Sequence, residues 1–209
     1  MAVSLSKGGN ISLAKSDSGP QALIVGLGWN PRTTDGAMFD LDASAILCTD
    51  QGKVRSDEDF VFYNRLGDKV LADGKTADTA TASVMHLGDN RDGQGDGDDE
   101  QVAIDLTRVP ADVAKIAFVV SIDQADTRGQ NFGQVSGAYI RVLDGDTNQV
   151  IESDGKKAQY DLAEDAAGET ALIFGEVYRH DGGWKFRAVG QGFSSGLAGV
   201  IKEFGLDAN

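Results

Sequence analysis

Six carboxylate side chains fall within thirteen consecutive residues, 88–100, which read Gly-Asp-Asn-Arg-Asp-Gly-Gln-Gly-Asp-Gly-Asp-Asp-Glu. They are Asp89, Asp92, Asp96, Asp98, Asp99 and Glu100, and only Arg91 opposes them. Four glycines are interleaved and no apolar residue is present, so the segment cannot bury itself. Glycine lets the backbone curl so that carboxylates and carbonyl oxygens point inward, and Ca²⁺ takes roughly six to eight such oxygens. The stretch therefore predicts a calcium-binding loop, with a solvated acidic loop as the alternative.

Two familiar calcium loops do not fit this segment. An EF-hand running from Asp89 to Glu100 would place Arg91 and Gly93 where oxygen side chains belong, and Gln94 where the turn glycine belongs. The Gly- and Asp-rich nonapeptide repeat needs tandem copies, and this chain has one. The loop is therefore expected to belong to another calcium-binding architecture.

Short apolar runs separated by turn residues predict the elements that position this loop. Residues 83–87 lead into it and residues 100–106 leave it, so it is expected to join two strands and close one end of a sheet. The spacing of Leu197, Val200, Ile201 and Phe204 predicts a C-terminal helix ending at Gly205. One helical turn is expected at 109–113, and further strands at 11–13, 21–29, 39–49, 60–64, 116–122, 138–143, 150–153, 158–162, 170–180 and 184–189. The pattern is typical of an all-β fold, an antiparallel β-sandwich with a short C-terminal helix, in a single domain over residues 1–209.

The strand predicted at 39–49 carries two of its acids at its start. Alternation puts Phe39, Leu41, Ala43, Ala45 and Leu47 on one face, and Asp40, Asp42, Ser44, Ile46 and Cys48 on the other. Asp40 and Asp42 then stand ~6.6–7 Å apart along one face and can reach over the end of the sheet to a metal. Surface carboxylates at a strand end are the alternative.

Other motifs give weaker support for chemistry. Residues 192–196 match the G-x-S-x-G pattern of hydrolases, but no histidine follows Ser194, so we expect a turn with Ser194 or Ser195 as N-cap of the terminal helix. His86, His180 and Cys48 are too widely scattered for a zinc site. Acids among the glycines of the loop would repel phosphate, so a phosphate cradle is excluded.

The composition limits the partners that the chain can take. The chain has 209 residues and a formal net charge of −14, which repels nucleic-acid phosphates and favours cations or basic partners. No nucleic acid is therefore expected. The single cysteine, Cys48, excludes an internal disulfide and fits a reducing compartment. The N-terminus has no signal-peptide apolar core, and no apolar run approaches the ~20 residues of a membrane span, so a cytoplasmic location is expected.

Motifs along nearly the whole chain resemble the TerD family of bacterial tellurium-resistance and stress-response proteins. The acidic run of residues 88–100 is the hallmark of that family. The other matching stretches are Val3–Leu5, Gly8–Leu13, Val25–Trp29, Phe39–Ser44, Phe62–Asn64, Gly175–Arg179 and Trp184–Gly192. A chance match of so many motifs in this order is not expected.

The resemblance implies a calcium-binding β-sandwich similar in layout to the calcium-dependent phospholipid-binding modules of eukaryotes, with no established catalytic activity. It also implies that Ca²⁺ is held at one end of the sandwich by the acidic loop and neighbouring strand ends. The implied ligands are Asp89, Asn90, Asp96, Asp98, Asp99 and Glu100, with Asp40, Asp42 and Asn64 as partners. The family pattern requires no acid at Asp92.

Two classes of function stay open. The first is a non-enzymatic calcium-binding protein of the tellurium-resistance and general stress response, acting as a docking or sensor module. Its partners would be other tellurium-resistance or membrane-associated proteins, or a membrane surface. The second is an enzyme that uses the acidic cluster as a catalytic metal site, which would need a nucleophile or tuned base beside the metal. Because no such group stands out, we expect the first.

Overall fold

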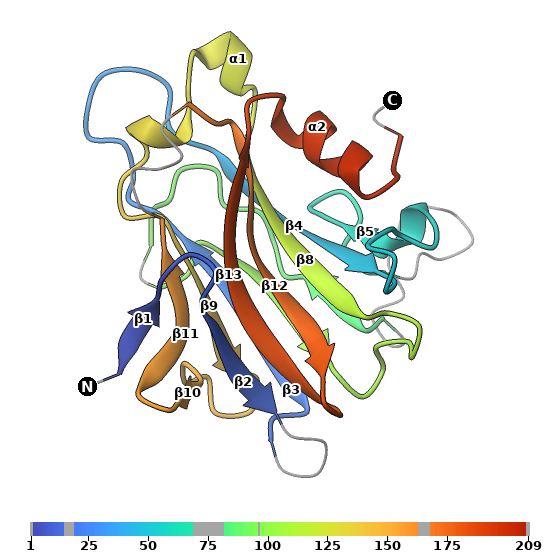
Figure 1. Ribbon diagram of the computed structural model, residues 1–209. Coiled ribbons are helices and arrows are strands. Elements are labelled where there is room, and N and C mark those ends of the chain that lie inside the picture. Colours follow the sequence, from blue (N-terminus) through green and yellow to red (C-terminus); the bar gives the residue numbers. More distant parts are fainter. Residues whose placement is uncertain (1, 15–18, 69–81, 96, 163–167, 208–209) are drawn as a thin grey trace.

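A computed structural model describes residues 2–14, 19–68, 82–95, 97–162 and 168–207. Two β-sheets pack face to face and enclose the main core between them (Figure 1). The prediction of an all-β sandwich with a short C-terminal helix is confirmed. None of the helices in these ranges is long and apolar enough to cross a membrane.

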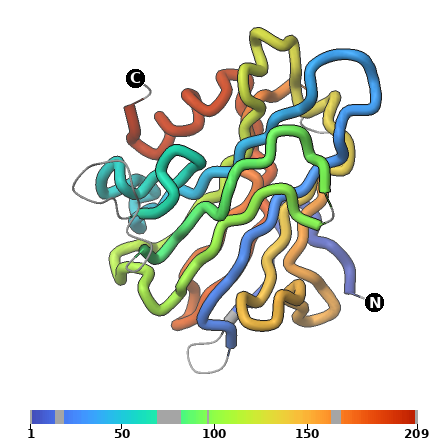
Figure 2. The backbone as a smooth tube through the Cα atoms, turned by 180° about the vertical axis from the view of Figure 1, so that it is seen from behind, coloured from blue at the N-terminus to red at the C-terminus, as the bar shows by residue number. Residues whose placement is uncertain are grey.

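One sheet holds the two strands that flank the acidic loop. Strands β6 and β7 pair antiparallel, and β7 pairs in turn with β3. Figure 2 shows the loop at the upper end of β6 and β7. In spatial order this sheet contains β1 (Val3–Leu5), β11 (Lys156–Asp161), β9 (Tyr139–Asp144), β3 (Ala22–Gly28), β7 (Glu100–Asp105) and β6 (Val84–His86), with β10 (Glu152–Ser153) paired to β11. The loop therefore closes one end of the seven-stranded sheet, as the sequence predicts.

The second sheet holds the strand that begins with two acids. Its spatial order is β2 (Asn10–Ala14), β13 (Gly183–Phe193), β12 (Ala171–His180), β8 (Lys115–Ile122), β4 (Leu41–Cys48) and β5 (Phe60–Val61). All of its neighbouring strands are antiparallel. The described part of the chain also contains four short helices: η1 (Asp57–Asp59), α1 (Ala125–Arg128), η2 (Phe132–Gln134) and α2 (Gly196–Glu203).

The predicted alternation of strand β4 is confirmed by its two buried faces. Leu41, Ala45 and Leu47 belong to the core between the sheets. Ile46 and Cys48 belong to a second apolar cluster on the outer face of the six-stranded sheet, which α2 covers with Val200 and Phe204 (Figure 1). Burial of this face explains why the strand is apolar on both sides from Ala45 to Cys48.

Several local predictions differ from the structure. The helical turn expected at 109–113 is wrong, because this segment forms turns without a helix. The strand expected at 60–64 ends at Val61, since Phe62 and Arg65 close a tight turn through paired backbone hydrogen bonds. Strand β1 was not predicted and pairs parallel with β11, an exception to the antiparallel pattern. Ser195 is the N-cap of α2, but its side chain makes no capping hydrogen bond.

Helix α2 is expected to stabilise the outer cluster through Val200, which is fully buried. Val200→Ala removes two methylene equivalents from that cluster, at roughly 0.8 kcal/mol each, so the free energy of unfolding should fall by about 1.5–2 kcal/mol. Urea denaturation monitored by circular dichroism measures this loss. Glu203→Ala on the exposed side of the same helix is the control and should change little. Equal effects of the two variants would mean that α2 does not pack as described.

Candidate metal centre

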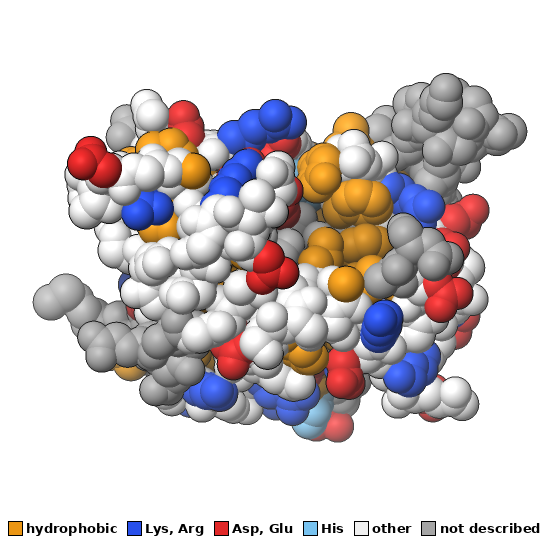
Figure 3. Space-filling model, turned by 90° about the horizontal axis from the view of Figure 1, so that it is seen from above, with side chains coloured by type: hydrophobic (Ala, Val, Ile, Leu, Met, Phe, Trp, Pro, Cys, Tyr) orange, Lys and Arg blue, Asp and Glu red, His pale blue; other side chains and the backbone are white. Residues whose placement is uncertain are grey.

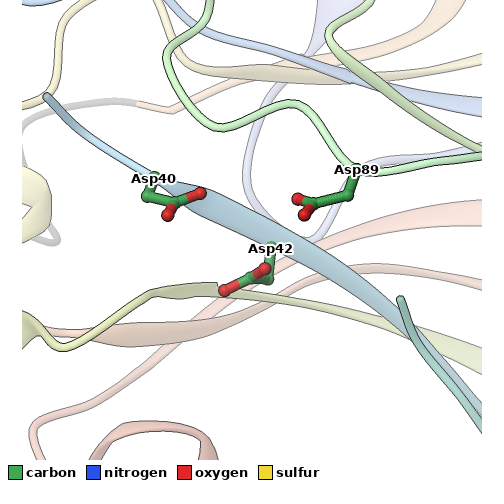
Figure 4. A group of neighbouring side chains, drawn as sticks. All are labelled: Asp40, Asp42 and Asp89. Atoms are coloured by element: carbon green, nitrogen blue, oxygen red, sulfur yellow. The ribbon is translucent and has the colours of Figure 1, made fainter. Parts of the chain in front are cut away.

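Three carboxylates from separate parts of the fold meet at the upper end of the sandwich. Asp40 and Asp42 lie at the start of β4, and Asp89 lies in the acidic loop. Each offers an oxygen within 4.8 Å of the others, and Figure 4 shows the three side chains pointing toward a common space. Two oxygens bound to one Ca²⁺ can lie at most roughly 4.6–5.2 Å apart, twice the metal–oxygen distance. This cluster therefore has the spacing that a bound calcium ion requires.

Strand pairing adds a fourth carboxylate. Leu41 of β4 faces Ile122 of β8, and one residue further along the N–H of Asp123 donates to the carbonyl oxygen of Asp40 at 2.8 Å. Asp123 thereby lines the same cavity, of about 250 Å³, as Asp40, Asp42 and Asp89. Two strand ends and one loop thus contribute four acids to one small space.

Two arginines border this cavity and offset part of its charge. Arg91 Nε lies 3.0 Å from Asp89 Oδ2. Arg128 of α1 lies 3.0 Å from Asp123 Oδ2 and 3.8 Å from Asp40 Oδ2. Figure 3 looks onto this end of the molecule and shows basic beside acidic side chains near the middle of the face, next to a group of hydrophobic side chains. Four acids against two cations leave the cavity negative.

Burial and crowding change the protonation of these acids. Burial is the largest cause that raises the pKa of Asp42 to about 8, and the charges of Glu100, Asp40, Asp123 and Asp89 raise it further. Burial, followed by Asp123 and Asp89, also raises the pKa of Asp40. At neutral pH Asp42 therefore keeps its proton when no cation is bound, and a cation would replace that proton.

The last acids of the loop face other parts of the protein. Asp98 Oδ1 accepts hydrogen bonds from Arg141 Nε at 2.7 Å and from the Tyr139 hydroxyl at 3.0 Å. The carboxylate lies so close to Gly26 that a Cβ at that position would collide with it. Asp99 Oδ2 accepts the backbone N–H of Trp29 at 2.8 Å. These two acids attach the loop to β3 and β9.

Among the described residues, the remaining predicted ligands are not members of the three-carboxylate cluster. Asn90 Oδ1 accepts the N–H groups of Asp92 and Gly93, so its side chain braces a turn within the loop. Glu100 is buried and bonded to backbone N–H groups. Asn64 is exposed in the turn after β5, and Asp96 lies outside the described residues. The predicted set thus divides: the structure brings Asp40, Asp42 and Asp89 together, and it places Asp98, Asp99, Asn90 and Glu100 in supporting contacts.

A second hollow lies on the other side of the loop. It measures about 580 Å³, and its acidic lining comes from Asp89, Asp92, Asp98 and Asp99. Within this lining, Asp98 accepts a hydrogen bond from Arg141, and Asp99 accepts one from the backbone N–H of Trp29. The same two carboxylates therefore line the hollow and attach the loop to the rest of the protein.

Comparison with known proteins places this architecture in a family. The TerD domain matches residues 1–204. The chain belongs to the TerD family. Its sequence is 54% identical over 209 residues to "Tellurium resistance protein TerD" of Serratia marcescens, covering all of both chains. It is 44% identical over 207 residues to "General stress protein 16U" of Bacillus subtilis, covering 99% of this chain and 98% of the relative. The resemblance seen in the sequence is therefore confirmed.

A solved structure shares the fold of this TerD-family chain. It is the crystal structure of a homologue of telluride resistance protein (TerD) from Streptomyces coelicolor, with a TM-score of 0.62 and 25% identity. The similarity covers 90% of this chain and 99% of that one. The two-sheet arrangement that brings the acids of this TerD-family chain together therefore has a close counterpart in a solved protein.

Sequence reasoning missed Asp123 as a member of the cavity in this TerD-family chain. The signal was present, because Asp123 directly follows the apolar run 116–122, which the sequence identifies as a buried strand. An acid at the end of one strand and Asp40 at the start of another become neighbours only if the two strands pair antiparallel. Tyr63, which also lines the cavity, had no such signal.

Proposed function

We propose that this chain is a calcium-binding protein of the tellurium-resistance and general stress response, without catalytic activity, that acts as a docking or sensor module. The observation that carries the proposal is the meeting of Asp40, Asp42 and Asp89 oxygens within 4.8 Å. The stress-response role is proposed from its similarity to a tellurium resistance protein and a general stress protein. Partners would be other tellurium-resistance or membrane-associated proteins, or a membrane surface.

The lining of the cavity supports binding over catalysis. Besides the four acids it contains Tyr63, Gln124 and the two arginines, and among the described residues no Ser, Cys or His lines it. Burial also raises the pKa of Cys48 to about 12, so this thiol is a poor nucleophile or reductant. When bound, Ca²⁺ would join the acidic loop to the start of β4 and the end of β8. A partner that recognises this end would then bind only the calcium-loaded form.

Calcium is expected to bind more tightly than magnesium. Mg²⁺ requires near-ideal octahedral geometry at ~2.0–2.1 Å and keeps several waters, whereas acids drawn from a glycine-rich loop and two strand ends suit the longer, variable contacts of Ca²⁺. Isothermal titration calorimetry with each ion in turn tests this expectation. Comparable affinity for both ions would contradict the assignment of calcium, and no binding of either ion would overturn the proposed function.

A further inference from the structure

Glu100 connects three parts of the fold through one buried carboxylate. It is the first residue of β7 and is 1% exposed. Its Oε2 accepts the backbone N–H of Ala43 at 2.5 Å, and its Oε1 accepts the backbone N–H of Asn90 at 3.3 Å. Strand β7 belongs to the seven-stranded sheet and Ala43 to the six-stranded one, so this side chain links the two sheets and the acidic loop.

The N–H of Ala43 needs an acceptor because its side of β4 has no partner strand there. Strand β8 pairs with β4 along one edge, whereas β5 pairs with the other edge only at Ala45 and Ile46. A buried backbone N–H without an acceptor costs roughly 1–3 kcal/mol. The carboxylate of Glu100 supplies the acceptor at the point where β5 has ended.

His86 supports the carboxylate from the neighbouring strand. The ring is buried, with 2% of the residue exposed, and its Nδ1 accepts the N–H of Gly88 at 3.3 Å. A neutral ring that accepts at Nδ1 carries its proton on Nε2. That atom lies 3.6 Å from Glu100 Oε2, too far for a normal hydrogen bond but close enough for a favourable electrostatic contact.

The two residues that Glu100 bonds are sequence neighbours of two acids of the cavity. Ala43 follows Asp42, and Asn90 follows Asp89. We propose that Glu100 is a positioning residue, which holds Asp42 and Asp89 at the spacing that a cation requires without binding the cation itself. This inference rests on the proposed calcium site. The carboxylate of Glu100 is buried, each of its oxygens accepts a backbone N–H, and it is not one of the three carboxylates whose oxygens meet within 4.8 Å.

Positioning matters here because the acids repel one another. Asp42 lies on a strand of the six-stranded sheet and Asp89 in the acidic loop that joins two strands of the other sheet, and like charges drive them apart unless the backbone beside each is fixed. Outer-shell partners of this kind typically contribute 10–100-fold to metal affinity. In the folded protein Glu100 already holds the backbone beside Asp42 and Asp89 in place. Part of the free energy needed to bring these acids together is therefore spent on folding and not on cation binding.

The test compares calcium affinity in Glu100→Gln and Glu100→Asp with the wild type by calorimetry. Gln keeps the length but has one oxygen, and its amide group donates, so one backbone N–H loses its acceptor. Asp keeps the charge but is shorter by one methylene and cannot reach both strands. Both variants should bind calcium about 10–100-fold more weakly. If Asp restores the wild-type affinity, charge alone acts and the positioning role is overturned.

Counting the water molecules on the bound metal distinguishes a direct ligand role of Glu100 from a positioning role. Luminescence lifetimes of bound Tb³⁺ in H₂O and D₂O should give the same number of waters in the wild type and in Glu100→Gln. An increase in that number would show that Glu100 is a ligand and would overturn the proposal.

A matched control is Glu176→Gln, which alters another buried glutamate, held by Lys115 and Arg187 away from the cavity. It should lower the melting temperature of the metal-free protein and leave calcium affinity unchanged. Glu100→Gln with wild-type affinity, in a protein whose Asp42→Asn variant no longer binds, would overturn the positioning role alone. Full binding by Asp42→Asn would instead overturn the proposed calcium site.

Discussion

Asp42→Asn combined with Asp89→Asn is expected to abolish the rise in melting temperature that calcium produces. Both side chains lie in the three-carboxylate cluster, Asp42 on strand β4 and Asp89 in the acidic loop. Calcium that binds only the folded protein stabilises it by about 2.7 kcal/mol at a hundredfold excess over Kd, which is roughly 5–10 °C for a chain of this length. Thermal unfolding with and without calcium measures the difference.

In the absence of calcium the same double variant should melt at the wild-type temperature or slightly higher. The variant removes the charge of Asp89 and replaces an Asp42 carboxyl that already keeps its proton below about pH 8, so repulsion within the cavity falls. Asp50→Asn with Asp161→Asn is the matched control, since both residues are exposed and the same two charges are removed elsewhere. This control should keep the full calcium-induced rise.

Asp98→Asn with Asp99→Asn provides the sharpest comparison. These side chains hold Arg141 and the backbone N–H of Trp29, so their loss should lower the melting temperature of the metal-free protein. The rise in melting temperature that calcium produces should persist in this variant. If the calcium-induced rise disappears here and survives in Asp42→Asn with Asp89→Asn, the cation is bound by Asp98 and Asp99 in the second hollow, whose lining also includes Asp89, and not by the three-carboxylate cluster.

Calcium affinity should rise steeply with pH through the neutral range. Asp42 has a pKa of about 8 in the folded protein, against an ordinary value of 3.8. Calcium requires the ionised carboxylate, so below about pH 8 each ion bound must displace a proton, and affinity should rise roughly tenfold per pH unit. Calorimetry at about pH 6.5, 7.5 and 8.5, in two buffers of different ionisation enthalpy, measures both the affinity and the released proton. An affinity that stays constant across this range would contradict the prediction.

The stability of the metal-free protein should change in the opposite direction. Between pH 4 and 8 the folded protein keeps a proton on Asp42 that the unfolded chain has released. The free energy of unfolding is therefore highest below about pH 4 for this group and declines as the pH rises through 8. Asp42→Asn should reduce that slope, as urea titrations across the range would show. Asp40 shifts in the same direction, so a smaller slope remains in the variant.

Local sequence patterns were enough to predict the fold class and the place of the acidic loop. Short apolar runs between turn residues identified most strands, and the motif order identified the TerD family. Alternation along residues 39–49 correctly separated the two faces of β4, because side chains of a strand point to opposite sides whatever its partners are. Such features depend on local chemistry, so the sequence contains them directly.

Which acids share a cavity depends on contacts between distant parts of the chain. Asp123 joins Asp40 because β4 and β8 pair antiparallel, a register that depends on contacts far apart in the chain. Acids close together in the sequence point in different directions at the end of the loop. Asp98 reaches Arg141, and Glu100, two residues later, reaches the N–H of Ala43 in the opposite sheet. A count of carboxylates gives the charge of a segment, but the direction of each side chain follows from the backbone that surrounds it.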